Sequence, residues 1–186
     1  LHGDAWLGEW DIDEQAATTI RLSFRHPADD VSPYAYTAEQ RISLEADSLS
    51  CAFAVTATEG SPLPFGIGHH PYFPLRPGTR LRLGKTGNFW CEGFDYLPDR
   101  PMAPPADLRF QDFAEPPRRR INNMYADWDG QAWVRWPDEG ITLHMQADPI
   151  FSRLMLFINT PERDPSYRFE YFCLEPMTHR PGGQAT

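Results

Sequence analysis

The strongest constraint on the fold is a pair of short segments that flank a turn. Residues 131–136 and 141–146 are separated by Pro137-Asp138-Glu139-Gly140. Proline and glycine at the ends of a polar tetrapeptide favour a tight turn, so this is the clearest β-hairpin in the sequence. No segment of the chain sustains a helical repeat beyond a turn or two.

Alternation of apolar and polar residues predicts further strands. In residues 18–25, the side chains of Ile20, Leu22 and Phe24 fall on one face. Two later segments are separated only by Asp47-Ser48, which suits an antiparallel hairpin. These two segments are residues 36–46 and 49–57. The remaining predicted strands are residues 80–83, 88–91, 152–159 and 167–175. Many strands at hairpin spacing predict an all-β fold of antiparallel sheets, either a sandwich or a closed barrel.

Two regions are predicted to lie outside strands. Residues 95–117 are rich in proline and acidic residues and show little periodicity, which indicates a long excursion, ordered as a wall of a cleft or else disordered. Asp127-Trp128-Asp129-Gly130 is typical of a hairpin turn.

Composition narrows the class of ligand. The chain has 186 residues, which favours a single domain spanning residues 1–186, and its formal net charge is -9. Negative charge disfavours binding to nucleic acid or to anionic membranes, so a neutral or weakly polar small molecule is the expected ligand. No apolar run approaches the ~20 residues of a membrane span, and no signal peptide precedes the first residues.

The cysteines and the first residue bear on location and completeness. Cys51, Cys91 and Cys173 are an odd number without paired spacing, and each sits among apolar residues. We therefore expect reduced thiols that serve as small core side chains in a cytoplasmic protein. The sequence begins at Leu1 without an initiator methionine, so we expect a fragment or a processed form.

One stretch combines residues that a core strand and an ordinary loop seldom share. It is Phe65-Gly66-Ile67-Gly68-His69-His70-Pro71-Tyr72-Phe73-Pro74-Leu75. We interpret it as the end of a buried strand that carries a titratable ring into a cleft, since imidazole changes its charge near neutral pH. A structural histidine pair beside a proline-rich turn is the alternative that these residues leave open.

The carboxylate of Glu175 is a second candidate group. It ends a predicted apolar strand and precedes Pro176, where ladder pairing should stop. Apolar neighbours favour partial burial, which raises the pKa of a carboxyl group towards that of a useful base; a solvated edge charge is the alternative. A histidine could supply the matching proton at neutral pH.

Other kinds of site have less support. The sequence contains no Gly-x-Ser-x-Gly elbow, phosphate loop or dinucleotide fingerprint. Adjacent side chains of an extended segment point to opposite faces, so His69 and His70 suit a shared metal ion poorly. We expect neither a metal nor a cofactor.

Three patches, in this order, resemble the aldose 1-epimerase (galactose mutarotase) family, above all its bacterial branch. They are Leu1-His2-Gly3, His70-Pro71-Tyr72-Phe73-Pro74-Leu75, and Cys173-Leu174-Glu175-Pro176 with Thr178 and His179. The second and third are fairly specific, the first is short, and the resemblance runs across essentially the whole chain. It implies a β-supersandwich and a cofactor-free enzyme that interconverts the α and β anomers of a free hexose or a related sugar.

The resemblance also implies roles for single residues. Glu175 would be the general base that takes the proton of the anomeric hydroxyl group, and His70 the general acid that protonates the ring oxygen. His2 would hydrogen-bond the sugar. Tyr72 and Trp128 are among the aromatic residues that could stack on the C–H face of the sugar, and core packing is the alternative for each.

The chain departs from the family at two points. The sugar-binding aspartate of the family is matched here by Asn122, which can bond hydroxyl groups but lacks the charge that strengthens such bonds. Family members also have strands before the first patch and after the glutamate. Missing edge strands would leave ladders open, so three interpretations stand: an incomplete chain, strands exchanged within a homo-oligomer, or impaired catalysis.

These departures keep two other functions open. A sugar-binding protein without turnover would retain the cleft. A hexose-phosphate epimerase would hold the phosphate with the basic run Arg118-Arg119-Arg120, although a solvated turn also explains that run and the negative net charge counts against a phosphorylated ligand.

Overall fold

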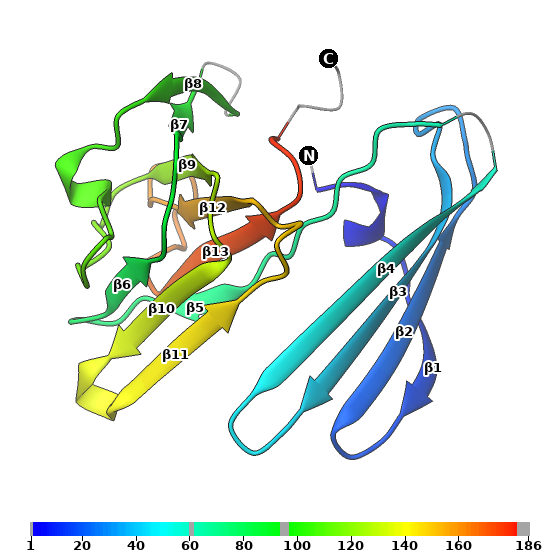
Figure 1. Ribbon diagram of the computed structural model, residues 1–186, viewed down its shortest axis with the longest axis horizontal. Coiled ribbons are helices and arrows are strands. Elements are labelled where there is room, and N and C mark those ends of the chain that lie inside the picture. Colours follow the sequence, from blue (N-terminus) through cyan, green and yellow to red (C-terminus); the bar gives the residue numbers. More distant parts are fainter. Residues whose placement is uncertain (1, 60–61, 94–96, 182–186) are drawn as a thin grey trace. The chain divides into compact units, whose positions relative to one another are not determined.

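The computed structural model describes residues 2–59, 62–93 and 97–181 and forms two compact units, Leu1–Pro64 and Phe65–Thr186 (Figure 1). Every named strand pair in these residues is antiparallel, which confirms the predicted all-β fold of antiparallel sheets. Within them, no helix has the length and apolar character needed to cross a membrane. The prediction of one domain stays a prediction. The helical turns are η1 (Asp4–Trp6), η2 (Ala106–Leu108) and η3 (Pro137–Glu139).

The first unit is a four-stranded meander in the order β1-β2-β3-β4. Its register places Phe24 beside Ala38 and Ala38 beside Val55, so alternate residues of three strands share one apolar face. Phe24, Tyr36 and Ala38 form the buried centre of that face. The strands are β1 (Asp11–Gln15), β2 (Thr19–His26), β3 (Ala35–Leu44) and β4 (Leu49–Glu59).

Two features of this unit differ from what the sequence predicts. The strand β1 is not predicted from the sequence. All of its residues are exposed, and a strand without a buried face needs no alternation of apolar and polar residues. Cys51 is exposed, so its predicted place in a core is wrong, whereas Cys173 in the second unit is buried as predicted. Cys51 lies on β4 beyond the part of the apolar face that Trp10 and Tyr34 pack against.

The second unit contains a six-stranded sheet and a three-stranded sheet that share one core. The large sheet has the order β5-β13-β12-β9-β7-β8, and the small sheet has the order β11-β10-β6. Leu81 and Val134 from the small sheet and Leu156 and Leu174 from the large sheet are fully buried in that core. The strands are β5 (Tyr72–Pro74), β6 (Arg80–Leu83), β7 (Phe89–Glu92), β8 (Pro98–Met102), β9 (Ile121–Ala126), β10 (Gln131–Trp136), β11 (Ile141–Gln146), β12 (Arg153–Ile158) and β13 (Tyr171–Met177).

The hairpin that the sequence predicts most clearly is β10 and β11, and it is confirmed. Trp136 pairs with Ile141 next to the turn. Pro137 opens η3, and Gly140 follows it with a φ of 66°, a left-handed conformation that glycine adopts without steric cost. The turn therefore sets the register of the small sheet.

Residues 127–130 join the two sheets, so the prediction of a hairpin turn there is wrong. The strand before them, β9, lies inside the large sheet, whereas β10 belongs to the small sheet. The carboxylate of Asp129 accepts hydrogen bonds from the backbone N–H groups of Lys85 and Gln131 at 2.8 and 3.1 Å. These bonds help to direct the chain from one sheet into the other.

β8 lies in the region 95–117, where no strand is predicted and where residues 95 and 96 lie outside the described residues. Its prolines are compatible with a strand because β8 is at the edge of the sheet, where a missing N–H group need not break a ladder. Leu108 and Phe110 then enter the core, and the Tyr125 hydroxyl group donates to the Leu108 carbonyl oxygen at 2.8 Å. This excursion is therefore an ordered flank of the core.

β13 differs at both ends from the predicted strand 167–175. It begins at Tyr171 and continues through Pro176. The Pro176 carbonyl oxygen accepts from the His69 N–H group at 3.0 Å, on the side away from β12. Because the missing N–H group faces that same side, pairing with β12 is intact, and Glu175 lies within the strand rather than at its end.

Candidate active site

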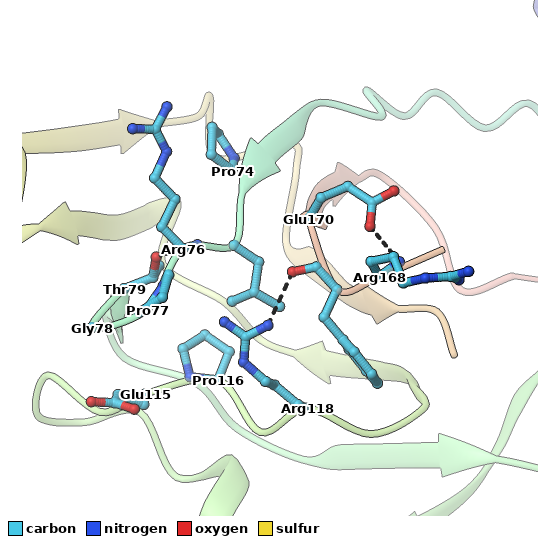
Figure 2. Close-up of a pocket in the computed structure, with 12 residues that line it drawn as sticks. Pro74, Arg76, Pro77, Gly78, Thr79, Glu115, Pro116, Arg118, Arg168 and Glu170 are labelled. Carbon is cyan, nitrogen blue, oxygen red and sulfur yellow. Dashed lines mark hydrogen bonds between the residues drawn. The ribbon is translucent and has the colours of Figure 1, made fainter. Parts of the chain in front are cut away.

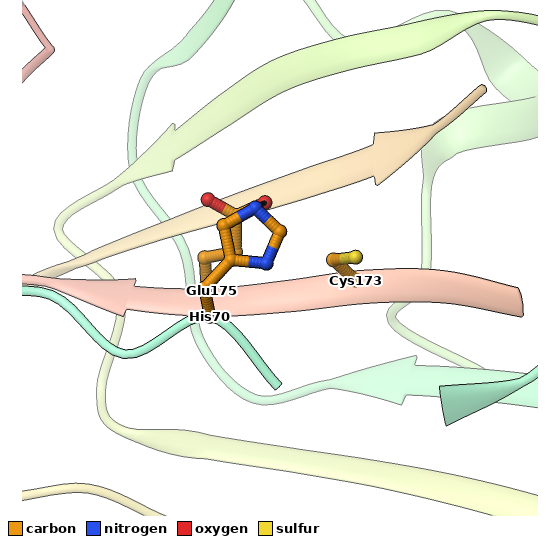
Figure 3. Close-up of side chains that lie close together, drawn as sticks. All are labelled: His70, Cys173 and Glu175. Carbon is orange, nitrogen blue, oxygen red and sulfur yellow. Dashed lines mark ion pairs between the residues drawn. The ribbon is translucent and has the colours of Figure 1, made fainter. Parts of the chain in front are cut away.

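Glu175 and His70 meet where β13 passes the segment that leads into β5. The register pairs Tyr72 with Cys173, and continuing the pairing by two residues brings His70 beside Glu175. His70 Nε2 lies 3.2 Å from Glu175 Oε1, and the two side chains are 16% and 13% exposed (Figure 3). Two side chains that are far apart in the sequence thus form one largely buried pair. His70 itself precedes β5 and does not end a longer strand.

Two hydrogen bonds join the segment that precedes His70 to the segment that follows Glu175. The Thr178 N–H group donates to the Ile67 carbonyl oxygen, and the Ile67 N–H group donates to Thr178 Oγ1, both at 2.9 Å. Gly66 leaves room for the His179 ring, since a Cβ atom at Gly66 would lie 2.1 Å from His179 Nδ1. Gly66, Thr178 and His179 therefore have structural roles next to the acid–base pair.

Burial changes the proton affinity of groups at this site. Desolvation raises the pKa of Glu175 to about 7, because the charged form loses its hydration. Burial, and then the charge of Glu175, raise the pKa of the Cys173 thiol. The His69 ring packs against Phe151 at 5.9 Å between centroids, and burial lowers its pKa. Near neutral pH, Glu175 is thus poised between its charged and neutral forms.

Tyr72 places an aromatic ring beside the pair. Its ring is stacked on the His70 imidazole, with centroids 5.0 Å apart and an interplanar angle of 24°. The Tyr72 ring also makes an edge-to-face contact with the Tyr171 ring, with centroids 5.1 Å apart. Tyr72 is 53% exposed, so its ring remains accessible to a ligand next to the acid–base pair.

A second polar group lies on the same sheet, around Asn122. Asn122 Nδ2 donates to Glu92 Oε1 at 3.2 Å, and Arg120 Nη2 donates to the same oxygen at 2.6 Å. β7 and β9 pair Trp90 with Met124, and the same register continued brings Glu92 to Asn122. The residues around Glu92 carry no local signal of a site, because only this strand pairing brings its partners to it.

The three arginines of the basic run have separate partners. Arg118 Nη1 donates to the Phe169 carbonyl oxygen at 3.3 Å. Arg119 holds Asp107, with Nη2 at 2.9 Å from Oδ2. Since Arg120 binds Glu92, the three guanidinium groups do not converge on one position.

The other two predicted substrate contacts lie in different surroundings. His2 belongs to the first unit, where its ring stacks on Trp6 at 4.8 Å; Leu1 of the same motif lies outside the described residues. The contact of His2 with a sugar stays a prediction. Trp128 is 3% exposed in the core of the second unit, and its indole N–H group donates to the Gln131 carbonyl oxygen at 2.8 Å. This position fits the core-packing alternative, because the ring offers almost no accessible face.

The acid–base pair also belongs to a group of three metal-ligating residue types. One ligand atom each from His70, Cys173 and Glu175 lie within 4.8 Å of one another (Figure 3). Zinc accepts imidazole, thiolate and carboxylate ligands. A metal would bind the thiolate form of Cys173, and the raised pKa of the thiol disfavours that form. The expectation that no metal binds here stays a prediction.

A pocket of about 790 Å³ lies elsewhere on the second unit (Figure 2). Its walls come from residues 74–79, from the segment around Pro116, and from residues 168–170. Neither His70 nor Glu175 lines it. The cleft predicted around His70 is therefore not this pocket.

Known proteins match the chain over nearly its whole length. A family model described as aldose 1-epimerase matches residues 1–180. The uncharacterized protein YphB of Escherichia coli K12 is 38% identical over 182 residues, which cover 97% of this chain and 61% of that relative. The chain thus spans about three fifths of the length of this relative.

Solved structures agree with the family match. A protein of Escherichia coli K12, provisionally named an aldose 1-epimerase, superposes with a TM-score of 0.91 at 37% identity over 97% of this chain and 61% of its own. A galactose mutarotase related enzyme from Lactobacillus acidophilus shares the fold, with a TM-score of 0.70 at 13% identity over 91% of this chain and 59% of its own. The match of the family model over residues 1–180 establishes that the chain belongs to the aldose 1-epimerase family.

Proposed function

We propose that the chain carries the acid–base pair of an enzyme that interconverts the α and β anomers of a free hexose or a related sugar. The observation that carries the proposal is the 3.2 Å approach of His70 Nε2 to Glu175 Oε1, with the pKa of Glu175 raised to about 7. A carboxylate with this pKa can take up a proton at neutral pH and return it. The family match supports the same reaction class.

The reaction moves protons between the pair and the two oxygen atoms that are bonded to C1 of the sugar. Glu175 takes the proton of the hydroxyl group on C1, while protonated His70 gives a proton to the ring oxygen. The bond between C1 and the ring oxygen breaks, its electron pair stays with that oxygen, and C1 becomes an aldehyde. Rotation about the C1–C2 bond presents the other face of the carbonyl group. The reverse transfers then close the ring as the other anomer, with no net change in protons or electrons.

The short distance between the two side chains suits this chemistry. The hydroxyl oxygen and the ring oxygen are bonded to the same carbon, so the base and the acid have to be close neighbours. Tyr72 stands beside them, and Asn122 lies further along the same sheet face, where hydroxyl groups of the sugar would lie.

The arginine run favours a free sugar over a sugar phosphate. A phosphate site usually brings several donors to one point. Arg118, Arg119 and Arg120 are bound to three different partners instead. The net charge of -9 also disfavours an anionic substrate.

Exchange spectroscopy by NMR tests the proposal directly. We expect the protein to accelerate exchange between the anomers of D-glucose or D-galactose above the rate in buffer. Saturable binding of either sugar in calorimetry without exchange would instead indicate a sugar-binding protein without turnover. Preference for glucose 6-phosphate, lost in an Arg119→Ala variant, would indicate a sugar-phosphate epimerase.

Removal of divalent metals with EDTA is expected to leave the exchange rate unchanged, because the proposed proton transfers use only side-chain groups. The rate would be measured in protein dialysed against EDTA, with untreated protein as the control. A loss of activity that added Zn²⁺ restores would show that His70, Cys173 and Glu175 hold an ion in the working enzyme.

The exchange rate is expected to fall as the pH drops below about 7. Glu175 acts as a base only when it is ionised, and burial raises its pKa to about 7, so each further pH unit below that value should cost about tenfold. NMR exchange between pH 5 and 8, with buffer blanks subtracted, measures this profile. A midpoint near 4.5, the value of a solvated glutamate, would contradict the role of a buried base.

A further inference from the structure

The carboxylate of Glu92 is held in a fixed orientation by two neighbouring side chains. Arg120 donates to both of its oxygens, from Nη2 to Oε1 at 2.6 Å and from Nε to Oε2 at 3.2 Å, and Asn122 Nδ2 adds a bond of 3.2 Å to Oε1. The Glu92 backbone N–H group donates to Asn123 Oδ1 at 3.1 Å. The Arg120 and Glu92 side chains are 25% and 20% exposed, so this group is partly buried but reachable from solvent.

This group lies on the same face of the large sheet as the acid–base pair. Cys173 pairs with Phe157, and Phe157 pairs with Asn122, so all three side chains share one face, and Glu175 lies two residues from Cys173 on that face. The guanidinium carbon of Arg120 lies 5.8 Å from the centroid of the Phe157 ring. An aromatic ring therefore lies between the acid–base pair on one side and the Glu92 group on the other.

The spacing of strands sets the size of ligand that could reach both ends. Adjacent strands lie about 4.8 Å apart, so the backbones of β13, which carries Glu175, and β7, which carries Glu92, are about 14 Å apart across three strand spacings. The Glu92 carboxylate reaches Asn122 on β9, so it lies nearer to β13 than its own backbone does. A single sugar ring placed over Phe157, with its anomeric carbon at Glu175, would point its remote hydroxyl groups towards Glu92.

The chemistry of the Glu92 group suits a neutral hydroxyl donor. A carboxylate can accept about four hydrogen bonds. Glu92 accepts two from Arg120 and one from Asn122. A ligand hydroxyl group can donate to the remaining position. Because Arg120 already fixes the carboxylate, little conformational freedom is lost when a ligand binds. The positive charge of Arg120 also balances the negative charge of Glu92. The group therefore suits an uncharged ligand.

We infer that Glu92 is a specificity-determining residue that accepts a hydrogen bond from a hydroxyl group remote from the anomeric carbon, and that Arg120 is its positioning residue. The inference rests on the proposed function and deepens it: the substrate is an aldose whose ring carries such a hydroxyl group. If the contacts of Glu92 with Arg120 and Asn122 served only to hold β7 against β9, their loss would affect all sugars equally.

The test compares Glu92→Gln and Arg120→Met variants of the full-length protein with the wild type on D-glucose and on its 2-, 3-, 4- and 6-deoxy analogues. Loss of a hydrogen bond to a charged group predicts a decrease in kcat/KM for glucose of about 10- to 100-fold, mainly through KM. The analogue that lacks the recognised hydroxyl group should show almost no difference between wild type and variant. A conservative Arg120→Lys variant should regain part of the preference for glucose.

Asp107→Asn is the matched control, because it breaks another arginine–carboxylate pair with similar bonds, from Arg119 Nε at 3.1 Å and from Nη2 at 2.9 Å. We expect this variant to match the wild type on every sugar. Circular dichroism would confirm that each variant is folded. An equal loss on all sugars, or no loss on any of them, would overturn the inference.

Calorimetry of the same sugars separates this inference from the proposed function. Absence of exchange by the wild type would contradict the epimerase proposal alone, because sugar binding would still report on Glu92. Weaker binding of glucose by Glu92→Gln, with unchanged binding of one deoxy analogue, supports the hydroxyl contact. Equal binding of glucose by Glu92→Gln, Asp107→Asn and the wild type rejects it.

Discussion

Replacing Glu175 by glutamine is expected to reduce anomer exchange by about 10²- to 10⁴-fold, to near the rate in buffer. Glutamine keeps the shape of the side chain and can still bond to His70 Nε2, which lies 3.2 Å from Glu175 Oε1. It cannot take up the proton of the anomeric hydroxyl group. NMR exchange with D-glucose and D-galactose would measure the loss.

Companion variants show whether the two groups act together. His70→Asn should cause a loss of similar size, and the double variant should be no slower than either single variant, because the groups serve one reaction step. Glu170→Gln is the control, since it removes an exposed carboxylate just before β13. Exchange at the wild-type rate by Glu175→Gln would refute the assignment of the base.

The same Glu175→Gln change is expected to stabilise the folded protein above neutral pH. Burial raises the pKa of Glu175 from 4.5 to about 7, so the folded state holds the proton more tightly than the unfolded chain does. The stabilisation from this group is complete below pH 4.5 and is lost as the pH rises through 7. At pH 8 the ionised, buried carboxylate lowers the free energy of unfolding by about 3 kcal/mol, which glutamine would restore.

Urea unfolding followed by tryptophan fluorescence would measure this effect at pH 5 and at pH 8. The variant should exceed the wild type by up to about 3 kcal/mol at pH 8 and by much less at pH 5. Glu170→Gln is the matched control, because it makes the same change from carboxylate to amide at an exposed position. A gap of the same size at both values would mean that glutamine acts through packing rather than through loss of a buried charge.

The acid–base pair can be predicted from the sequence more readily than its surroundings. His70 stands among glycines, prolines and aromatic residues, and Glu175 follows an apolar strand, so each carries a local signal. Glu92 carries none. Its partners Arg120 and Asn122 reach it only through the pairing of β7 with β9, and local alternation cannot predict which strands become neighbours.

β8 and Trp128 show a second limit of local patterns. Prolines at positions 98 and 101 argue against a strand until the edge position of β8 is known. Trp128 stands beside Asp129 and Gly130 in a turn, and the same letters would suit a turn that faces a ligand. Only its 3% exposure shows that the ring packs in the core.

The strand β13 has a consequence for how this family can diversify. Phe172 and Leu174 are fully buried on one of its faces, Glu175 projects from the other, and β12 and β5 hold its two edges. A backbone anchored in this way has little freedom to adapt when the preferred sugar changes over evolutionary time. Changes in ligand choice should therefore accumulate on short strands such as those that bear Tyr72 and Glu92, while the residues that transfer protons are inherited unaltered.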